Sequence, residues 1–407
     1  MLNLNLKHRY NFFLAMSKKD NPSESGRRNF FRIAAAGSLG AFLASTPLKK
    51  VLAQVQDPEK PATNIADALK IPKTETSMPG KFPGKVVKVV DPHSVVDDKP
   101  VKTAAYQMLS DAMLQLTGAA TLSEAWLMFV QPHEKIGLKL NPIGGKLLSS
   151  SHEVVQSVIE QMLEAGIPKE NIVLWDRREF QLHEAGFTAD AYPGIAITGT
   201  EKKDADGAYY NKEGKLYSEE MIDKDWFYFA DVDGEYDDYT LPFMVNNGKY
   251  SYFTKICTQE LDKIINIPIL KNAGASITLC LKNLGYGVIT NTGRLHAQLW
   301  GDTSAEVCCF PPVRDKVVLN VVDGLRGCYQ GGPGANPQYI CNYNTLLVGT
   351  DAVAVDRIGY DIVLKKRIDE GIQQEDSPRG RQFMEYAAQL GLGEADIQKI
   401  DLFEIVK

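Results

Sequence analysis

The sequence lacks the motifs that mark the commonest cofactor and metal sites. Its six cysteines form no C-x-x-C pair, so the usual zinc and iron–sulfur spacings are absent. Its six histidines show no recognisable metal-site spacing, and neither a P-loop nor a G-x-S-x-G elbow occurs. We therefore predict no metal site and leave the cofactor unassigned. A thiolate site built from Cys308, Cys309, Cys328 and Cys341 is the alternative, as is a disulfide between Cys328 and Cys341.

Positive charge is also scarce, and this narrows the range of partners. The 407 residues contain 51 Asp+Glu against 45 Lys+Arg, and no basic stripe with interleaved aromatic residues is present. This balance argues against nucleic-acid binding. With 44% hydrophobic and 24% charged residues, the composition is that of a folded globular protein. No apolar run is long enough to predict a membrane-spanning helix in the mature chain.

The N-terminal segment predicts export rather than a part of the fold. Arg27 and Arg28 precede a short apolar run, residues 33–44, and small residues end at Ala53. This order resembles a twin-arginine export signal, the Tat type. We therefore predict a signal peptide over residues 1–53, the Tat translocation machinery as a partner, and a periplasmic location. The alternative is an N-terminal anchor that is retained.

The rest of the chain divides into an arm and one domain. Residues 54–81 are rich in Pro, Lys, Thr and Asp and predict an extended linker or arm, whereas residues 82–407 predict an α/β domain. Residues 135–141 and 171–175 predict strands. Between them Ser150, with Glu153 three residues later, predicts the start of a helix. This β-α-β order requires the two strands to be parallel.

Further apolar runs extend the predicted sheet. Residues 263–270, 316–322 and 345–348 each have the composition of a buried strand. Residues 188–255 differ, because they are rich in Tyr, Asp and Gly with short alternating segments, and they predict a β-rich insertion. The fold class that follows is α/β, with a mainly parallel sheet flanked by helices.

Polar residues follow each of the predicted strands. They are Lys139 and Asn141, Asp176 and Arg177, Lys271, Asp323, and finally Gly349 to Asp351. Ligands of open parallel sheets bind beyond the carboxyl ends of the strands. We therefore expect these residues to converge at one site. The alternative is that they are ordinary helix caps and turns, an alternative strongest for Asp351.

A long segment without acidic residues supplies the remaining candidates. Residues 263–301 contain no Asp or Glu but include Lys282, Asn283, Arg294 and His296 among several glycines. Lysine, arginine and backbone N–H groups suit a carboxylate or phosphate. Beside Arg294, the His296 imidazole should stay neutral and act as a base. The alternative is a structural ion network in which Asp176, Asp323 or Asp356 pairs with these cations.

These residues define one predicted pocket with two kinds of role. Proton transfer is assigned to Asp176, His296 and Asp323, and substrate binding to Lys139, Asn141, Arg177, Lys271, Lys282, Asn283 and Arg294. Three hypotheses remain open at this point. The protein is an exported enzyme acting on a small anionic substrate, an exported binding or assembly protein for an anionic ligand or metal complex, or a structural domain with an internal ion network.

Several segments taken together resemble one known family. They are IGLKLNPIGG, SSSHEVV, NIVLWDR, INIPILKNAGASITLCLKNLGYG, GRLH, NVVDGLRGCYQGGPG and VGTDAVAVDRIGY, within about residues 82–370. They resemble the domain of unknown function 362 family. The resemblance implies the fold and the place of the site, and an exported location, but no established activity. Some relatives carry a ferredoxin-like module with C-x-x-C clusters, and this chain has none, so an electron-transfer role is not implied.

Overall fold

One large sheet organises the protein. The computed structural model describes residues 60–233 and 248–407. Its ten-stranded sheet has the order β14 (Asp401–Val406), β1 (Lys85–Val90), β13 (Ile340–Gly349), β12 (Val317–Cys328), β9 (Lys263–Asn266), β4 (Ile136–Lys139), β5 (Ile172–Arg178) and β6 (Ala196–Glu201), while β10 (Ile269–Ala273) joins β12 and β11 (Ser276–Ile277). Most neighbouring strands are parallel, although β13 is antiparallel to β1 and β12. The predicted α/β class with a mainly parallel sheet is confirmed.

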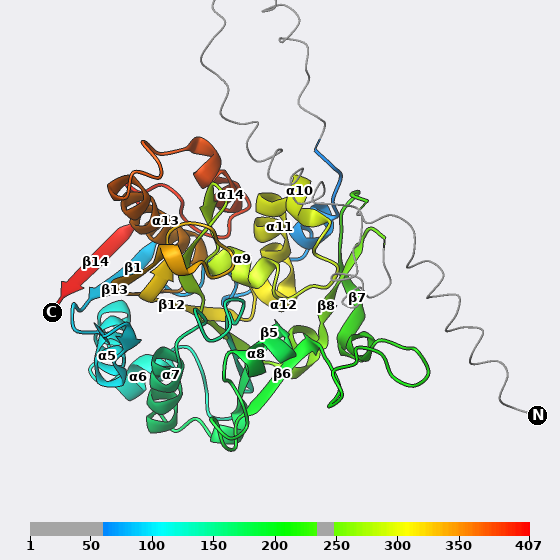
Figure 1. Ribbon diagram of the computed structural model, residues 1–407, viewed down its shortest axis with the longest axis horizontal. Coiled ribbons are helices and arrows are strands. Elements are labelled where there is room, and N and C mark those ends of the chain that lie inside the picture. Colours follow the sequence, from blue (N-terminus) through cyan, green and yellow to red (C-terminus); the bar gives the residue numbers. More distant parts are fainter. Residues whose placement is uncertain (1–59, 234–247) are drawn as a thin grey trace, which may run out of the picture. The chain divides into compact units, whose positions relative to one another are not determined.

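Helices cover both faces of this sheet (Figure 1). One face carries α5 (Lys102–Thr117), α6 (Leu122–Leu127) and α7 (His152–Glu164), and the other carries α9 (Cys280–Gly285), α11 (Trp300–Glu306), α12 (Pro311–Arg314), α13 (Ala352–Asp369) and α14 (Pro378–Gln389). Alternate strand residues serve the two cores: Leu174 packs with α5–α7, whereas Val173 and Trp175 pack with the opposite helices. Full burial of such a side chain stabilises the fold by about 1.5–3 kcal/mol.

The predicted β-α-β unit is confirmed, with one correction at its helix. Strand β4 pairs in parallel with β5, Ile136 facing Ile172. The N-cap of α7 is Ser151 and not Ser150, since the Ser151 side chain accepts a hydrogen bond from the Val154 N–H. Ser150 is buried one residue earlier. Its hydroxyl accepts the Asn141 N–H at 2.9 Å and donates to the Ile267 carbonyl at 2.7 Å, which anchors the loop after β4.

Two predicted strands differ from their expected extent. Residues 263–270 form two strands, β9 and β10, because Pro268 cannot donate to the ladder between them. Strand β12 runs on to Cys328, so Asp323 lies inside a strand and not after one. The short connection from β12 returns the chain as antiparallel β13. The carboxyl end of β13 therefore lies at the opposite edge, and Asp351 caps α13 there by accepting the Val353 and Ala354 N–H groups.

The predicted β-rich insertion is smaller than expected. Strand β6 falls within residues 188–255 but pairs in parallel with β5, so it extends the main sheet. The separate hairpin consists of β7 (Ile222–Phe229) and β8 (Tyr250–Thr254). The remaining described elements are α4 (Ile65–Leu69), α8 (Glu179–Glu184), α10 (Leu295–Gln298) and the pair β2 (Val95–Val96) and β3 (Lys99–Pro100).

The N-terminal predictions fall largely outside the described residues. The structure does not describe the predicted signal, residues 1–53, or the first residues of the arm, 54–59. From Lys60 onward the arm lies on the domain: Lys60 contacts Glu306 at 3.0 Å, the Thr63 hydroxyl donates to Glu306, and Met78 is buried. In the ranges that the structure describes, every helix is too short or too polar to cross a bilayer.

The six cysteines are all free thiols. Cys328 lies opposite Ile340 and Cys341 lies opposite Gly327 in the β12–β13 ladder. Successive strand residues point to opposite faces, so this register directs the two thiols to different sides of the hairpin. The structure thus gives no support to a disulfide between them.

A buried carboxylate on α13 fixes the position of α9. Asp356 is fully buried and accepts the backbone N–H groups of Cys280 (2.6 Å) and Leu281 (3.0 Å) at the start of α9. Burial raises the pKa of Asp356 to about 7, and the two N–H groups act against that rise. Helix α9 carries Lys282 and Asn283, so Asp356 indirectly positions two of the predicted site residues.

Replacing Asp356 tests this arrangement. The Asp356→Ala variant should lose about 2–4 kcal/mol of unfolding free energy, because two buried N–H groups are left without acceptors. Urea denaturation measures the loss. Asp361→Ala, on the same helix, is the control: its partly exposed pair with Arg357 should be worth at most about 0.5 kcal/mol. Equal effects of the two substitutions would contradict a special role for Asp356.

Candidate functional site

A cavity of about 210 Å³ opens beyond the carboxyl ends of β4 and β5. We call it the cationic pocket. Seven of the ten predicted site residues line it: Lys139, Asn141, Asp176, Arg177, Lys282, Asn283 and His296. An eighth, Lys271, lies behind Asn141 and donates to its side-chain oxygen at 2.9 Å. Placement at the strand ends thus brought together residues that are far apart in the sequence.

Lys139 forms the floor of the pocket. Its side chain is completely buried, and its ammonium group donates to the Leu140 carbonyl (2.8 Å), to Asp176 and to the Asn283 side-chain oxygen (3.2 Å). These acceptors use all three ammonium protons. Burial lowers the pKa of Lys139, and the Asp176 carboxylate opposes this shift. Lys139 is therefore part of the framework that joins β4, β5 and α9.

Buried asparagines continue this framework through the sheet. The Asn141 side-chain amide donates to Asn283 (3.1 Å), Asn283 donates to Asn266 (2.8 Å), and Asn266 donates to Asn320 (3.0 Å). We call these four residues the asparagine chain. Every amide directs its oxygen toward the lysines and its N–H away, in the orientation that satisfies all the bonds. Aligned in this way, the amide dipoles favour the positive charges of Lys139 and Lys271.

The asparagine chain provides the hydrogen-bond acceptor for the ammonium group of Lys271. It is fully buried and its one hydrogen-bond partner in the described ranges is Asn141, a neutral amide. Burial lowers the pKa of Lys271 to about 7, with Lys282 among the lesser contributors. Sequence reasoning missed Asn266 and Asn320. The available signal was a lone polar residue inside an otherwise apolar strand, in KIINIP and VVLNVV.

Lys282 is set apart from the other cations. Its residue is only 8% exposed, and its ammonium lies 5.5 Å from the centres of the Tyr286 and Trp300 rings. In residues 60–233 and 248–407, no carboxylate pairs with it and no acceptor hydrogen-bonds to it. Removal from water lowers the pKa of Lys282 to about 8. Its charge is held in place by aromatic faces and not by an acid.

The neighbouring arginines are paired. Arg178 Nε lies 2.8 Å and Arg177 Nε 3.4 Å from carboxylate oxygens of Glu201, on β6. Arg177 also donates to the Tyr286 carbonyl at 3.0 Å and to the Thr292 hydroxyl. These two arginines are therefore balanced within the protein, by an acid that the predicted ion network did not include. Sequence reasoning missed Glu201, because its strand was assigned to the insertion.

His296 stands at the mouth of the pocket, where it remains exposed to solvent. Its Nδ1 lies 3.0 Å from the Thr292 carbonyl, so Nδ1 carries the proton and Nε2 keeps a lone pair. The ring packs on Tyr286, 4.5 Å between centres. Partial loss of solvent, followed by the charges of Lys282 and Arg177, lowers the pKa of His296 to about 4. The imidazole is therefore neutral at pH 7, although Arg294, from which its neutrality was predicted, is not a cause of the lowered pKa.

Three predicted residues do not line the pocket: Lys271, which lies behind Asn141, and Arg294 and Asp323, which lie elsewhere. The Arg294 guanidinium donates to the carbonyls of Ala230 (3.0 Å), Val232 (3.2 Å) and Lys249 (2.9 Å) and to the Ser251 hydroxyl (3.0 Å). It thereby secures the β7–β8 hairpin. The expectation of one pocket for all ten residues does not describe Arg294, because its guanidinium is engaged by these four acceptors of the hairpin.

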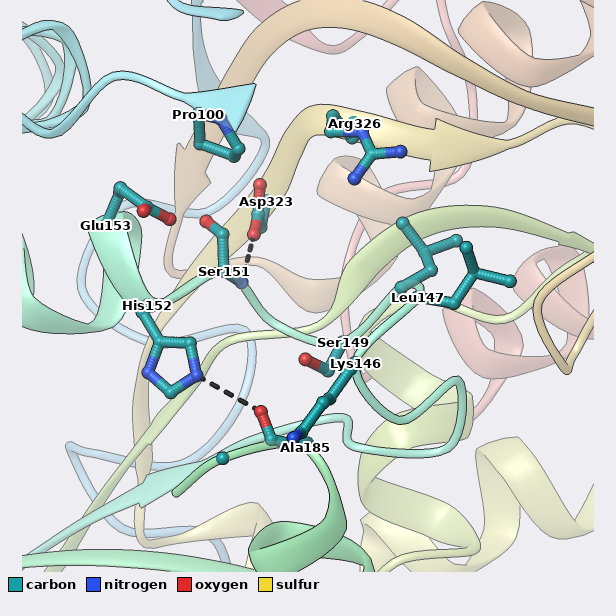
Figure 2. A pocket seen from close by; sticks show the side chains of 12 residues that line it. Pro100, Lys146, Leu147, Ser149, Ser151, His152, Glu153, Ala185, Asp323 and Arg326 are labelled. Atoms are coloured by element: carbon teal, nitrogen blue, oxygen red, sulfur yellow. Dashed lines mark hydrogen bonds between the residues drawn. The ribbon is translucent and has the colours of Figure 1, made fainter. Parts of the chain in front are cut away.

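Asp323 lines a second cavity, of about 310 Å³ (Figure 2). Its carboxylate accepts the Ser151 N–H at 2.7 Å and the Leu325 N–H at 3.1 Å, and it shares the cavity with Arg326, Lys146 and His152. Burial raises the pKa of Asp323 to about 6. Asp323 thus holds the start of α7, in a cavity separate from the cationic pocket.

The glycine-rich loop after β12 closes one side of the cationic pocket. Pro333 lines the pocket, following Gly332. A Cβ on Gly332 would lie 1.7 Å from the Asn272 carbonyl oxygen, so only glycine permits this close approach. No group of three or more His, Cys, Asp and Glu residues in the described ranges is arranged to hold a metal ion.

Comparison with known proteins gives a family without a function. Residues 136–361, more than half of the chain, match the family described as Domain of unknown function (DUF362). The match spans both strands of the β-α-β unit, the acid-free segment and most of α13. None of the curated proteins matches the chain.

Gly287 tests the packing of the pocket floor. A Cβ at this position would lie 2.4 Å from Lys139 Cε and 2.3 Å from the Asn283 carbonyl oxygen. Gly287→Ala should therefore cost about 1–3 kcal/mol of unfolding free energy by overpacking. Gly334→Ala is the matched control, since no atom lies within 4 Å of its added Cβ. Thermal or urea unfolding that shows equal effects would mean that Lys139 does not pass beneath Gly287.

Proposed function

The chain belongs to the DUF362 family, and on this premise we propose that its cationic pocket binds a small carboxylate or phosphate and that the protein is an exported enzyme acting on such a substrate. The proposal rests on the pocket itself, since the family carries no assigned activity. A phosphate or a two- to four-carbon carboxylate is of a size suited to a cavity of about 210 Å³.

The observation that carries the proposal is the position of Lys282. The other buried cations of the site have acceptors within the protein: Lys139 has Asp176, Lys271 has Asn141, and the two arginines have Glu201. Lys282 has aromatic rings alone. A buried charge without a partner costs free energy, and an anionic ligand would remove that cost by supplying the missing charge.

The pocket also holds groups suited to proton transfer. His296 offers an unprotonated Nε2 at the mouth, and the Asp176 carboxylate lies at the floor in contact with Lys139. A neutral base near a bound anion can remove a proton from it, and the adjacent ammonium stabilises the negative charge that develops. Asp323 has no part in this scheme, because it lines the other cavity.

A non-catalytic binding or assembly protein is the second candidate. The paired arginines and the fully satisfied Lys139 favour it, because a rigid, preorganised floor serves binding as well as catalysis. The two candidates differ in their dependence on His296. Binding alone should survive His296→Gln, whereas turnover of a substrate should not.

Export is part of the same proposal. The arginine pair Arg27–Arg28, the short apolar run and the small residues before Gln54 support delivery to the periplasm by the Tat machinery. Acidic residues dominate the chain more strongly once residues 1–53 are removed, since that segment carries nine Lys and Arg but two Asp and Glu.

Lys282→Met tests the binding role of the unpaired amine. Binding of inorganic phosphate or acetate, measured by calorimetry, should weaken by about 1.5–3 kcal/mol, the range of a charged hydrogen bond. Stability at pH 7 should rise by about 1–3 kcal/mol, because the native pKa of Lys282, about 8, lies below that of an unfolded lysine. The unfolded chain then binds the proton more tightly, so wild-type stability should increase between about pH 8 and 10.

The variant should show a smaller increase above pH 8, because Lys282 no longer contributes while Lys271, with a pKa of about 7, still does. Lys99→Met, at an exposed position, is the control and should change neither binding nor the pH profile. Unchanged anion affinity together with a loss of stability in Lys282→Met would instead assign the lysine to a structural role.

The export proposal is tested by changing the arginine pair. With Arg27 and Arg28 both replaced by lysine, the precursor should accumulate in the cytoplasm, since the Tat machinery distinguishes arginine from lysine at this pair. Cell fractionation and the mass of the exported form provide the measurement, with an N-terminus expected near Gln54. Normal export of the double variant would rule out this route.

A further inference from the structure

We propose that Lys282 is a nucleophilic amine that forms an imine with an aldehyde or a 2-oxo acid in the cationic pocket. This inference rests on the proposed function and narrows the class of anionic substrate, because it requires a carbonyl group beside the anionic group. It assigns to Lys282 a covalent role in addition to its charge.

The three lysines of the site differ in the availability of their amines. Lys139 is surrounded by three acceptors, which hold each of its protons and leave no free approach to Nζ. Lys271 does not line the cavity and is separated from it by Asn141. Lys282 does line the cavity, and no acceptor in the described ranges holds its protons. It is therefore the amine that a ligand in the pocket would meet.

The surroundings of Lys282 favour the reactive, uncharged form of the amine. The Tyr286 and Trp300 rings replace water on two sides of Nζ, and in the described ranges no carboxylate pairs with this amine. An amine becomes a nucleophile at neutral pH when an apolar setting removes it from water and so lowers its pKa, as burial does for Lys282. Aromatic walls also exclude the water that would hydrolyse an imine.

The chemical step is balanced within the pocket. The lone pair of the neutral Lys282 Nζ attacks the carbonyl carbon, a C–N bond forms, and the carbonyl π electrons move to oxygen. His296 Nε2 accepts a first proton from nitrogen and returns it to that oxygen, which gives a carbinolamine. A second proton then passes from nitrogen to the hydroxyl by the same route, and the hydroxyl leaves as water while the C=N bond forms. The remaining charge of the substrate, a carboxylate, lies among the cations of the pocket. No oxidant or reductant is required.

Reductive trapping tests the proposal with glyoxylate as the probe. The full-length folded protein is incubated with glyoxylate and sodium cyanoborohydride at pH 7, and peptide mass mapping compares Lys282 with the exposed Lys99. A lysine with a pKa of about 8 is about 200-fold richer in free amine at pH 7 than an ordinary lysine. We expect labelling of Lys282 to be at least about tenfold faster, after allowance for restricted access.

Two variants show whether the labelling depends on the pocket. Lys282→Met should lose the fast-labelled site while the Lys99 rate stays unchanged. His296→Gln should slow labelling of Lys282 severalfold without changing Lys99, because proton transfer during imine formation is impaired. Labelling of Lys282 no faster than that of Lys99 in the wild-type protein would overturn the proposal.

Acetate separates this inference from the proposed function. Acetate that binds in a Lys282-dependent manner and blocks fast labelling supports both. Acetate that binds while labelling of Lys282 stays as slow as that of Lys99 overturns the imine and leaves anion binding intact. Fast labelling without acetate binding supports the imine and contradicts a general anion site. If acetate does not bind and Lys282 is labelled no faster than Lys99, both the anion site and the imine are overturned.

Discussion

The site depends on one buried ion pair, Lys139 with Asp176, at the carboxyl ends of β4 and β5. The pair joins neighbouring strands, and its third partner, Asn283, ties it to α9. Neither charge would be tolerated alone at this depth, since an unpaired buried charge is strongly destabilising. The asparagine chain joins this pair through Asn283, Lys271 joins the chain through Asn141, and Gly287 leaves room for the Lys139 side chain.

The balance of charge around this pair explains why a ligand is expected. Glu201 compensates the charge of the two arginines, and Asp176 compensates that of Lys139. The charges of these cations are therefore balanced within the protein. Lys282, enclosed by rings, and Lys271, held by a neutral amide, have no such acid. The positive charge left over is thus that of Lys282 and Lys271, and both Lys282 and His296 lie against the Tyr286 ring.

Much of the fold could be predicted from the sequence because its patterns are local. The apolar runs, the helix after β4 and the parallel β-α-β unit were all readable, and the strand ends identified Lys139, Asn141 and Asp176. The direction of β13 was not readable, because it depends on how the chain returns after β12. Asp323 was misplaced for a different reason: its strand continues beyond the expected end.

The remaining errors come from side-chain direction. Arg294 and His296 are two residues apart, yet one secures the β7–β8 hairpin and the other lines the pocket. Asn266 and Asn320 were marked only by being lone polar residues in apolar strands, and the importance of Glu201 arises from partners distant in the sequence. A segment rich in positive charge indicated the region of the site but not the orientation of each cation.

The most direct test of the central claim is the pKa of Lys282 measured by nuclear magnetic resonance on protein with labelled lysine side chains. The Lys282→Met variant identifies the signal. The account predicts a pKa of about 8 without ligand, and an increase of at least about one unit when acetate or phosphate supplies the missing charge. An ordinary value near 10.4, or a low value that neither anion changes, would contradict a ligand-binding role for this amine.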